Sequence, residues 1–416
     1  RRQRLQEFER RLYSGGEYTP TNWFSAAASR VLQMSYLDKL ASPAYHVINS
    51  MEPWTVSLPV LAAKHGAMAT VRAMHEAYSA IGAARVLGAG AKDTAKAFRQ
   101  DAGFTDYAKT FKERVAGAPD GAELVAMFDK LIETGLLSRN AGQELTRATF
   151  ENTSRVGRAL DRADLMARQF GTAVEGVNRA VTSIAAYRLA RRRGMSEEAA
   201  RAHAVEAVHD TMGNYNAWNA APMFNHPLGR LALQFRKYAQ KTYYLLGKQV
   251  AGMKRGDPEA YKAFAGLMAT HFMIAGTLGL PLEPLRAAML AAGLLGITDA
   301  KYDDLEQNVR RGASAVFGKL GGEIFARGPA RLLGIDLASR MGLDGLVMQP
   351  IDPKTMKKDD LYAYFAKSFA GAPADFILDA SQGFQALGRG DVDEALRLLV
   401  PLKIFADSIQ AYQMTT

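Results

Sequence analysis

Apolar residues recur at spacings of three and four along almost the whole chain, and β-branched residues rarely alternate with polar ones. This period matches the turn of an α-helix rather than the two-residue repeat of a strand. The sequence therefore predicts an all-α fold with no sheet of consequence. The 37 glycines are scattered through the helical stretches instead of being pooled in linkers, which favours an elongated, multi-helical protein of several short, kinked helices in small bundles.

Capping residues mark where the helices begin. The spans 120–123 and 391–394 each match a capping box, with aspartate as the cap and glutamate three residues later. Ser196 precedes two glutamates, and Asp257 is followed by a proline that suits the first helical position. Glycine and proline predict the helix ends, at Gly194, Gly213, Gly256, Gly390 and Pro401.

Three breaks divide the chain, at residues 116–119, near Ala221 and Pro222, and at residues 349–353. The chain starts without a methionine, and we expect it to be a segment of a longer polypeptide. No repeat of fixed period is present, so the sequence does not indicate a solenoid. The predicted helical regions are 1–118, 119–221, 222–349 and 350–416.

Composition narrows the possible functions. Lysine and arginine number 52 against 42 aspartates and glutamates, and the net charge of +10 favours nucleic acid, acidic partners or anionic lipid. The absence of cysteine excludes disulfides, thiolate metal sites and cysteine nucleophiles. The basic N-terminal stretch has no apolar run behind it, so nothing marks the chain for secretion.

No group of residues has the pattern of a catalytic or metal site. His203, Glu206 and His209 contain one Glu-x-x-His, but a di-iron bundle needs a second copy, and zinc proteases need histidines four apart. Residues 87–94 resemble a phosphate loop only faintly and are better explained as a helix end. No Gly-x-Ser-x-Gly elbow and no Glu-Ser dipeptide occurs. We therefore expect no catalytic residues, no metal and no cofactor in this segment.

A basic line runs along the helix predicted near residues 228–255. At about 100° per residue, its members fall within roughly 20° of one line along the helix. The line is either the solvated face of a core-packed helix or a stripe that binds phosphate groups of DNA or lipid without sequence specificity. Its members are Arg230, Lys237, Lys241, Lys248 and Arg255. The apolar residues expected on the opposite side are Leu231, Phe235, Tyr238, Tyr243, Leu246, Val250 and Met253.

An apolar segment follows this helix. His271 is the only ionisable residue between 263 and 282, a run about long enough to cross a bilayer. After Pro281 and Pro284, a second run to Thr298 repeats small residues every four positions, which allows close helix packing. The segment is either two buried helices or a hairpin that enters a membrane, with His271 facing protein or a channel. The candidate core or membrane residues are Phe264, Leu267, Met268, Phe272, Met273, Ile274, Leu278, Leu290, Leu294 and Leu295.

The residues around the basic helix carry a resemblance to a known family. Residues 209–216, 222–224 and 226–238, the last with Pro227, Leu228 and Arg230, resemble the proline-leucine-x-arginine region near the C-terminus of very large phage polyvalent and internal virion proteins. Residues 387–401 resemble the end of that helical region. The similarity in order and spacing covers roughly residues 180–414, and Leu231 and Ala232 depart from the strict motif, in which a Phe-Gly pair is expected.

The resemblance implies a structural component of the DNA-ejection machinery of a short-tailed phage. Such a protein sits on the portal inside the capsid, then helps form a DNA conduit across the host envelope. The implied partners are a homo-oligomeric ring, the portal, other internal virion proteins, nonspecific double-stranded DNA and the host inner membrane. Any peptidoglycan-cleaving domain would lie outside this segment. The alternatives are a helical linker of a mobile polyvalent toxin or defence protein delivered into a recipient cell, and an enzyme with an unrecognised site.

Overall fold

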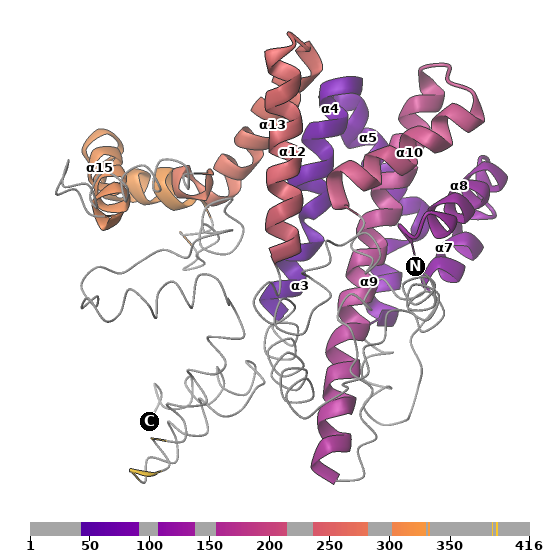
Figure 1. Cartoon of the computed structure of the whole chain (residues 1–416), viewed down its shortest axis with the longest axis horizontal. Helices are drawn as coiled ribbons and strands as arrows, with labels where there is room; N and C mark the ends of the chain where they lie inside the picture. The colour runs from indigo at the N-terminus through magenta and orange to yellow at the C-terminus, as the bar shows by residue number, and fades with distance from the viewer. Residues whose placement is uncertain are drawn as a thin grey trace, which may run out of the picture. The chain divides into compact units, whose positions relative to one another are not determined.

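A computed structural model describes residues 43–90, 107–137, 155–213, 236–281 and 302–329, with Leu332, Gln385, Gly388 and Arg389. These residues form ten α-helices, one π-helical turn and one 3-10 turn, and no strand occurs among them (Figure 1). The predicted all-α fold is confirmed.

Residue contacts group the chain into two compact units, each of which gathers segments that are distant in sequence. The first unit comprises residues 1–53, 65–234 and 372–416, and the second comprises residues 54–64 and 235–371. This grouping in space differs in kind from the four consecutive regions divided at breaks in the sequence. One of those breaks, residues 116–119, is a short turn between two helices that pack on each other within the first unit.

The first unit is built around α9 (Arg155–Arg192). Between residues 172 and 190 of this helix, every residue except Glu175 and Arg188 is buried. A helix that is covered on several sides buries its polar residues as well, so these side chains need partners inside the protein. The helices that pack on α9 include α3 (Pro43–Ser50), α5 (Ala67–Ile81), α7 (Tyr107–Val115) and α10 (Glu197–Met212), while α8 (Gly121–Glu133) packs mainly on α7 and α10.

Glycine has different effects in different helices. α9 runs for 38 residues and is longer than the short helices expected from the scattered glycines. At Gly176, an added Cβ would come within 3.2 Å of the Phe111 ring, so the glycine permits close packing of α7 rather than a kink. In α15 (Tyr302–Arg327), by contrast, Gly318 has φ 72° and ψ 171° and does kink the helix.

The helix boundaries follow the local signals closely. Ser196 caps α10 by accepting a hydrogen bond from the backbone N–H of Ala199 at 3.3 Å. Asp257 caps the helix that begins at Pro258 in the same way, by accepting a hydrogen bond from the backbone N–H of Glu259 at 2.9 Å. Glycines end helices with positive φ, as predicted at Gly194, Gly213 and Gly256. The boundaries predicted at Gly390, Asp391 and Pro401 lie outside the described residues.

The second unit combines a short N-terminal segment with later helices. α12 and α13 lie side by side and are joined by a turn of three residues. Val56 from the N-terminal segment packs with Leu245 of α12 and Leu267 of α13, and the backbone carbonyl of Thr55 accepts a hydrogen bond from the Thr270 hydroxyl at 3.1 Å. The elements are η1 (Pro53–Ser57), α4 (Leu58–His65), α12 (Arg236–Lys254), α13 (Pro258–Ala275), η5 (Thr277–Gly279) and α15.

Candidate functional site

The predicted basic line maps onto α12 and the turn that follows it. Lys248 and Arg255 are exposed and Lys241 is half-buried. Arg230 and the side chain of Lys237 lie outside the described residues. Arg255 comes after the helix end, in a turn where its N–H donates to the carbonyl of Gly252 at 2.9 Å, so it does not extend the helical line.

The buried face of α12 is only partly the predicted one. Leu246 is buried as expected, but Val250 is 36% exposed, so its predicted inward position is wrong. The reason is that the buried face is centred near Gln249, and the next residue lies about 100° around the helix. The expected positions Leu231 and Phe235 are not described, nor is the side chain of Tyr238. The buried residues of α12 are Thr242, Leu245, Leu246, Gln249 and Gly252.

The apolar segment forms one helix and part of a turn rather than a continuous run of twenty helical residues. α13 ends at Ala275 because Gly276 turns the chain with φ 68°, and η5 follows. Among the described residues, no helix is long and apolar enough to cross a membrane. Of the candidate residues, Leu267 and Leu278 are buried, Phe264, Met268, Phe272 and Ile274 are half-buried, Met273 is 60% exposed, and Leu290, Leu294 and Leu295 lie outside the described residues.

His271 lies on the buried side of α13, as expected for a ring that faces protein. It is 3% exposed, and its Nδ1 is 2.8 Å from the carbonyl oxygen of Leu267 one turn earlier. Burial lowers the pKa of His271 below its usual range, and the contact with the Leu267 carbonyl opposes this shift. The ring is therefore neutral in the folded chain near neutral pH.

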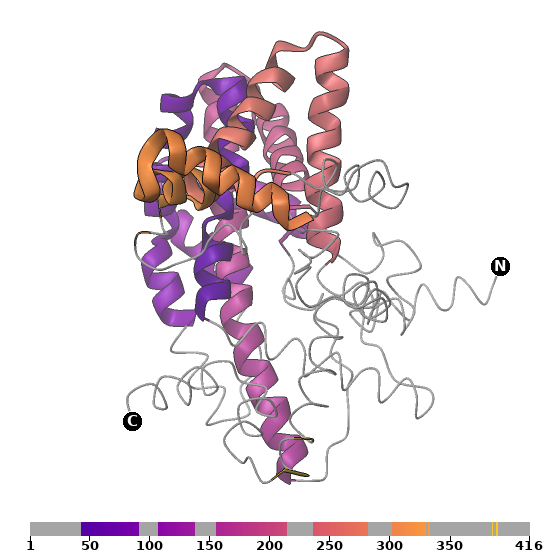
Figure 2. The ribbon, with the colours of Figure 1, turned by 90° about the vertical axis from the view of Figure 1, so that its left-hand side faces the viewer.

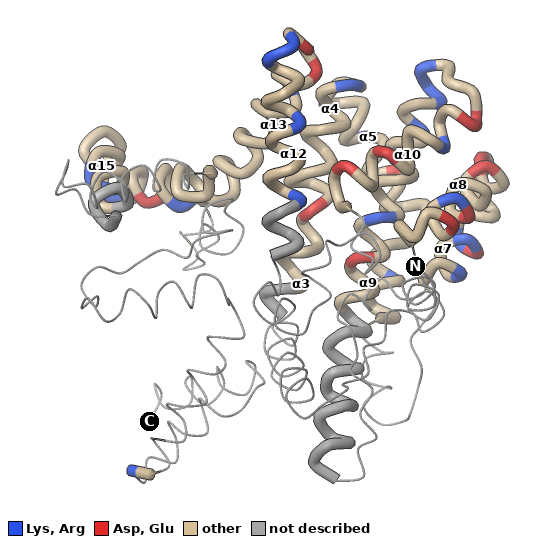
Figure 3. The backbone as a smooth tube through the Cα atoms, viewed as in Figure 1, with Lys and Arg blue, Asp and Glu red and all other residues tan. Residues whose placement is uncertain are grey.

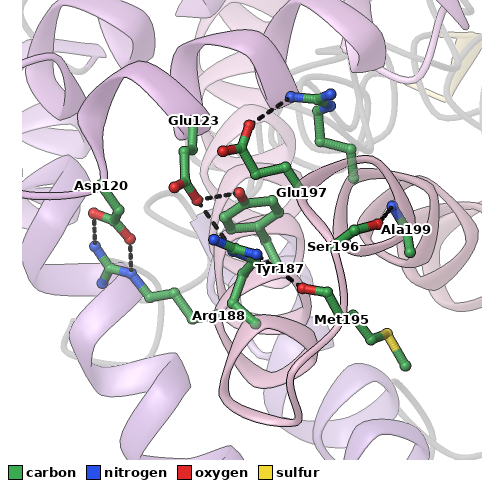
Figure 4. Close-up of polar contacts among 10 residues, drawn as sticks. Asp120, Glu123, Tyr187, Arg188, Met195, Ser196, Glu197 and Ala199 are labelled. Carbon is green, nitrogen blue, oxygen red and sulfur yellow. Dashed lines mark hydrogen bonds and ion pairs between the residues drawn. The ribbon is translucent and has the colours of Figure 1, made fainter.

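A polar cluster joins the start of α8, the end of α9 and the start of α10 (Figure 4). The guanidinium of Arg188 donates to both carboxylate oxygens of Asp120, at 2.7 and 2.9 Å. Glu123 accepts a hydrogen bond from the Tyr187 hydroxyl and lies 3.3 Å from Nε of Arg191. The sequence predicts a capping box of Asp120 and Glu123, but the Asp120 side chain forms no hydrogen bond that caps α8. Side chains from α9 bind these two carboxylates instead.

The pKa shifts within this cluster favour a structural role, in which the polar contacts hold the helices together. The hydrogen bonds from Arg188 hold the pKa of Asp120 below its usual range, although partial burial opposes the shift. Burial, followed by the hydrogen bond to Glu123, raises the pKa of Tyr187. A carboxylate that acts as a general acid needs a raised pKa, and Asp120 has the opposite shift. Figure 3 shows basic and acidic residues interleaved on these helices, in keeping with ion pairing between them.

The histidines of the candidate metal motif do not converge on one another. The Nε2 of His203 lies 3.0 Å from the Nε2 of His65, and the two ring centroids are 5.1 Å apart. His209 lies beside Asp210, with Nδ1 and Oδ1 3.8 Å apart. Within the described ranges, no group of three or more histidines and carboxylates has the geometry to hold a metal ion. Residues 83–90 are helical, and the rest of the faint phosphate-loop pattern is not described.

One exposed apolar feature was missed by the sequence analysis. At the kink of α15, Val316, Phe317 and Leu320 are 73%, 56% and 66% exposed. Their spacing alone would suit an ordinary core-facing helix. The only sequence signal is the density of glycine around them, at Gly312, Gly318, Gly321 and Gly322.

Comparisons with protein-family models, curated proteins and solved structures find no match to this chain. The class that the structure defines is an all-α protein of two helical units.

Proposed function

We propose that the chain is a structural segment of an internal virion protein of a short-tailed phage, which sits on the portal and helps to form the DNA conduit across the host envelope. The observation that carries this proposal is the resemblance of residues 209–238 and 387–401 to the C-terminal region of such proteins. The helical character of the described residues supports it. Any peptidoglycan-cleaving activity of the whole protein would reside in another segment.

The half-buried Lys241 and the exposed Lys248 and Arg255 offer a binding surface for packaged DNA or anionic lipid. Replacing Lys241 and Lys248 by glutamine should flatten the salt dependence of nonspecific duplex binding, by about one unit of slope for each phosphate that the variant no longer neutralises. Lys262 is exposed on α13 and outside the line, so Lys262→Gln is the matched control. An unchanged slope in the double variant would assign these lysines to simple solvation.

The decisive experiment locates the protein in particles of the phage that encodes it. Quantitative mass spectrometry of purified virions, before and after genome release, should find several copies in full particles and a large loss from emptied ones. Cross-linking before release should connect copies of the chain to one another and to the portal. Absence from purified particles refutes the proposal. Fusion to toxin or defence modules that reach a recipient cell would establish the polyvalent alternative.

A further inference from the structure

The kink of α15 is a built structure with two arms. Arg310 and Glu323 form an ion pair, with Nε and Oε1 2.7 Å apart. In a straight helix thirteen residues would rise about 20 Å, beyond the reach of these side chains, so the helix must fold back at Gly318. Figures 1 and 2 show α15 (orange) change direction along its length.

Close contacts fix the two arms against each other. A Cβ at Gly322 would lie 2.6 Å from the backbone of Ser314, so only glycine fits at this crossing. The rings of Phe317 and Phe325 stack with centroids 5.3 Å apart, and Phe272 of α13 packs edge-on against Phe325 at the same centroid distance. The bend is therefore held from both arms and from α13.

The tip of this bend presents apolar side chains to the outside. Residues 315–320 are all exposed, and they include Val316, Phe317 and Leu320. Single exposed apolar residues are common, but a contiguous apolar patch marks a site of contact with another molecule or a membrane. We define this feature, residues 315–320, as the α15 tip.

The charges around the α15 tip are positive. Between residues 309 and 327 the chain carries four basic residues and one acidic residue, a formal charge of 4 − 1 = +3. Lys319 lies within the tip and Arg311 lies one helical turn before it, and both are exposed, while Glu323 forms an ion pair with Arg310. The other acidic residues of α15 lie at its start, in the span 303–306.

We propose that the α15 tip inserts into the surface of an anionic lipid bilayer, with Val316, Phe317 and Leu320 entering the acyl boundary and Lys319 and Arg311 contacting lipid phosphates. An apolar face rimmed by lysine and arginine is the pattern of interfacial membrane binding, with apolar groups buried about 5–10 Å deep. A second copy of the chain fits less well, because pairing two tips would bring Lys319 and Arg311 of each copy against like charges. The inference rests on the proposed function only for the source of the membrane.

The first test is sedimentation of the full chain with vesicles of equal parts phosphatidylcholine and phosphatidylglycerol. Val316→Ser combined with Leu320→Ser should weaken partitioning by about 10- to 100-fold, since each removes one apolar side chain from the bilayer. The control combines Val47→Ser with Met68→Ser, two residues that are 62% and 74% exposed in the first unit. Lys319→Glu should lower binding to these vesicles more than to vesicles of phosphatidylcholine alone.

A label at the tip tests the depth of insertion directly. Because the chain has no cysteine, Leu320→Cys carries a single environment-sensitive fluorophore. Its emission should shift to the blue when vesicles are added, and the same label on Met68→Cys should not shift. The inference is overturned if the serine pair binds like the wild type, or if the tip label stays in water while the protein is bound. It is also overturned if the wild type does not bind vesicles and the double variant Val316→Ser, Leu320→Ser abolishes self-association in analytical ultracentrifugation.

Failure of this inference and failure of the proposed function give different results. A protein found in virions that does not bind vesicles through the α15 tip keeps the virion role and has no membrane role at this site. A protein that binds vesicles through the tip but is absent from virions keeps the membrane role and has no virion role.

Discussion

Replacing Asp120 by asparagine separates two roles that the residue could have. If Asp120 serves as the cap of α8, the change should be nearly silent, because asparagine caps helices about as well as aspartate. If its main role is the two-point ion pair with Arg188, at 2.7 and 2.9 Å, the change removes the charge that this pair depends on. The structure favours the second role, since no cap bond forms.

The expected cost follows from the burial of the pair. The side chains of Arg188 and Asp120 are 15% and 27% exposed, between the limits of surface pairs and fully buried pairs. Surface pairs contribute roughly 0–1 kcal/mol, and breaking a buried pair costs roughly 3–5 kcal/mol. We therefore expect Asp120→Asn to lower the free energy of unfolding by about 2 kcal/mol.

Urea unfolding followed by far-UV circular dichroism measures this cost as a lower midpoint at an unchanged slope. Asp129→Asn is the matched control on the same helix, because Asp129 is 57% exposed and pairs with Lys112 at the surface; we expect a change within about 0.5 kcal/mol. The pKa of Asp120 is lowered in the folded chain, so the pair stabilises fully above the unfolded pKa near 4 and progressively less as the pH falls below it. The difference between wild type and Asp120→Asn should shrink in that range. Equal costs for the two asparagine variants would refute the ion-pair role.

Two further variants test the second unit by the same assay. His271→Gln should flatten the loss of stability between about pH 7 and pH 5, because burial lowers the pKa of His271 and only the unfolded chain takes up the proton as the pH falls through about 6.5. An equal loss of stability with falling pH in wild type and His271→Gln would contradict the reasoning. Gly276→Ala should cost about 2–3 kcal/mol, because the new Cβ would lie 2.5 Å from the carbonyl carbon of Ala326 and the residue has positive φ. Gly256→Ala has positive φ but nothing within 4 Å, so it should cost only about 1 kcal/mol, and equal costs would show that the contact with α15 is not tight.

The sequence predicted those features that a few adjacent residues determine. The caps at Ser196 and Asp257 and the end at Gly194 depend on side chains within one turn, and all three are as expected. The partner of Asp120 was not predictable, since Arg188 is 68 residues away and nothing local to α8 indicates it. The same limit applies to residues 54–64, which pack with helices far along the chain.

On the candidate surfaces too, the sequence predicted what helical spacing determines and did not predict what depends on distant packing partners. Helical spacing predicted correctly that Lys248 would be exposed. It placed Val250 inward because the apolar face was taken as the side opposite the basic residues, whereas the face that packs is centred near Gln249. The apolar residues of the α15 tip have the spacing of a core helix. Whether such a face is covered depends on what packs against it, and here the fold-back at Gly318 turns it outward.

Directional polar bonds give the first unit its register. The buried stretch of α9 is rich in alanine and valine, and such small, similar side chains would bury nearly the same area if a neighbouring helix shifted by one turn. Three bonds from α9 would not survive that shift of about 5.4 Å. Asn178 donates to the backbone carbonyl of Asn49 in α3 at 2.8 Å, and Arg179 donates to the carbonyl of Leu136 at 2.6 Å. Arg188 donates to the carboxylate of Asp120, the residue before α8.

A shifted helix would also leave the guanidinium of Arg179, 4% exposed, deprived of the Leu136 carbonyl while still buried. Leaving a buried charge with fewer hydrogen bonds is costly, so alternative packings that bury the same apolar area are disfavoured. The apolar residues of the first unit therefore drive its helices together, and the polar residues on α9 decide which of the possible arrangements is stable.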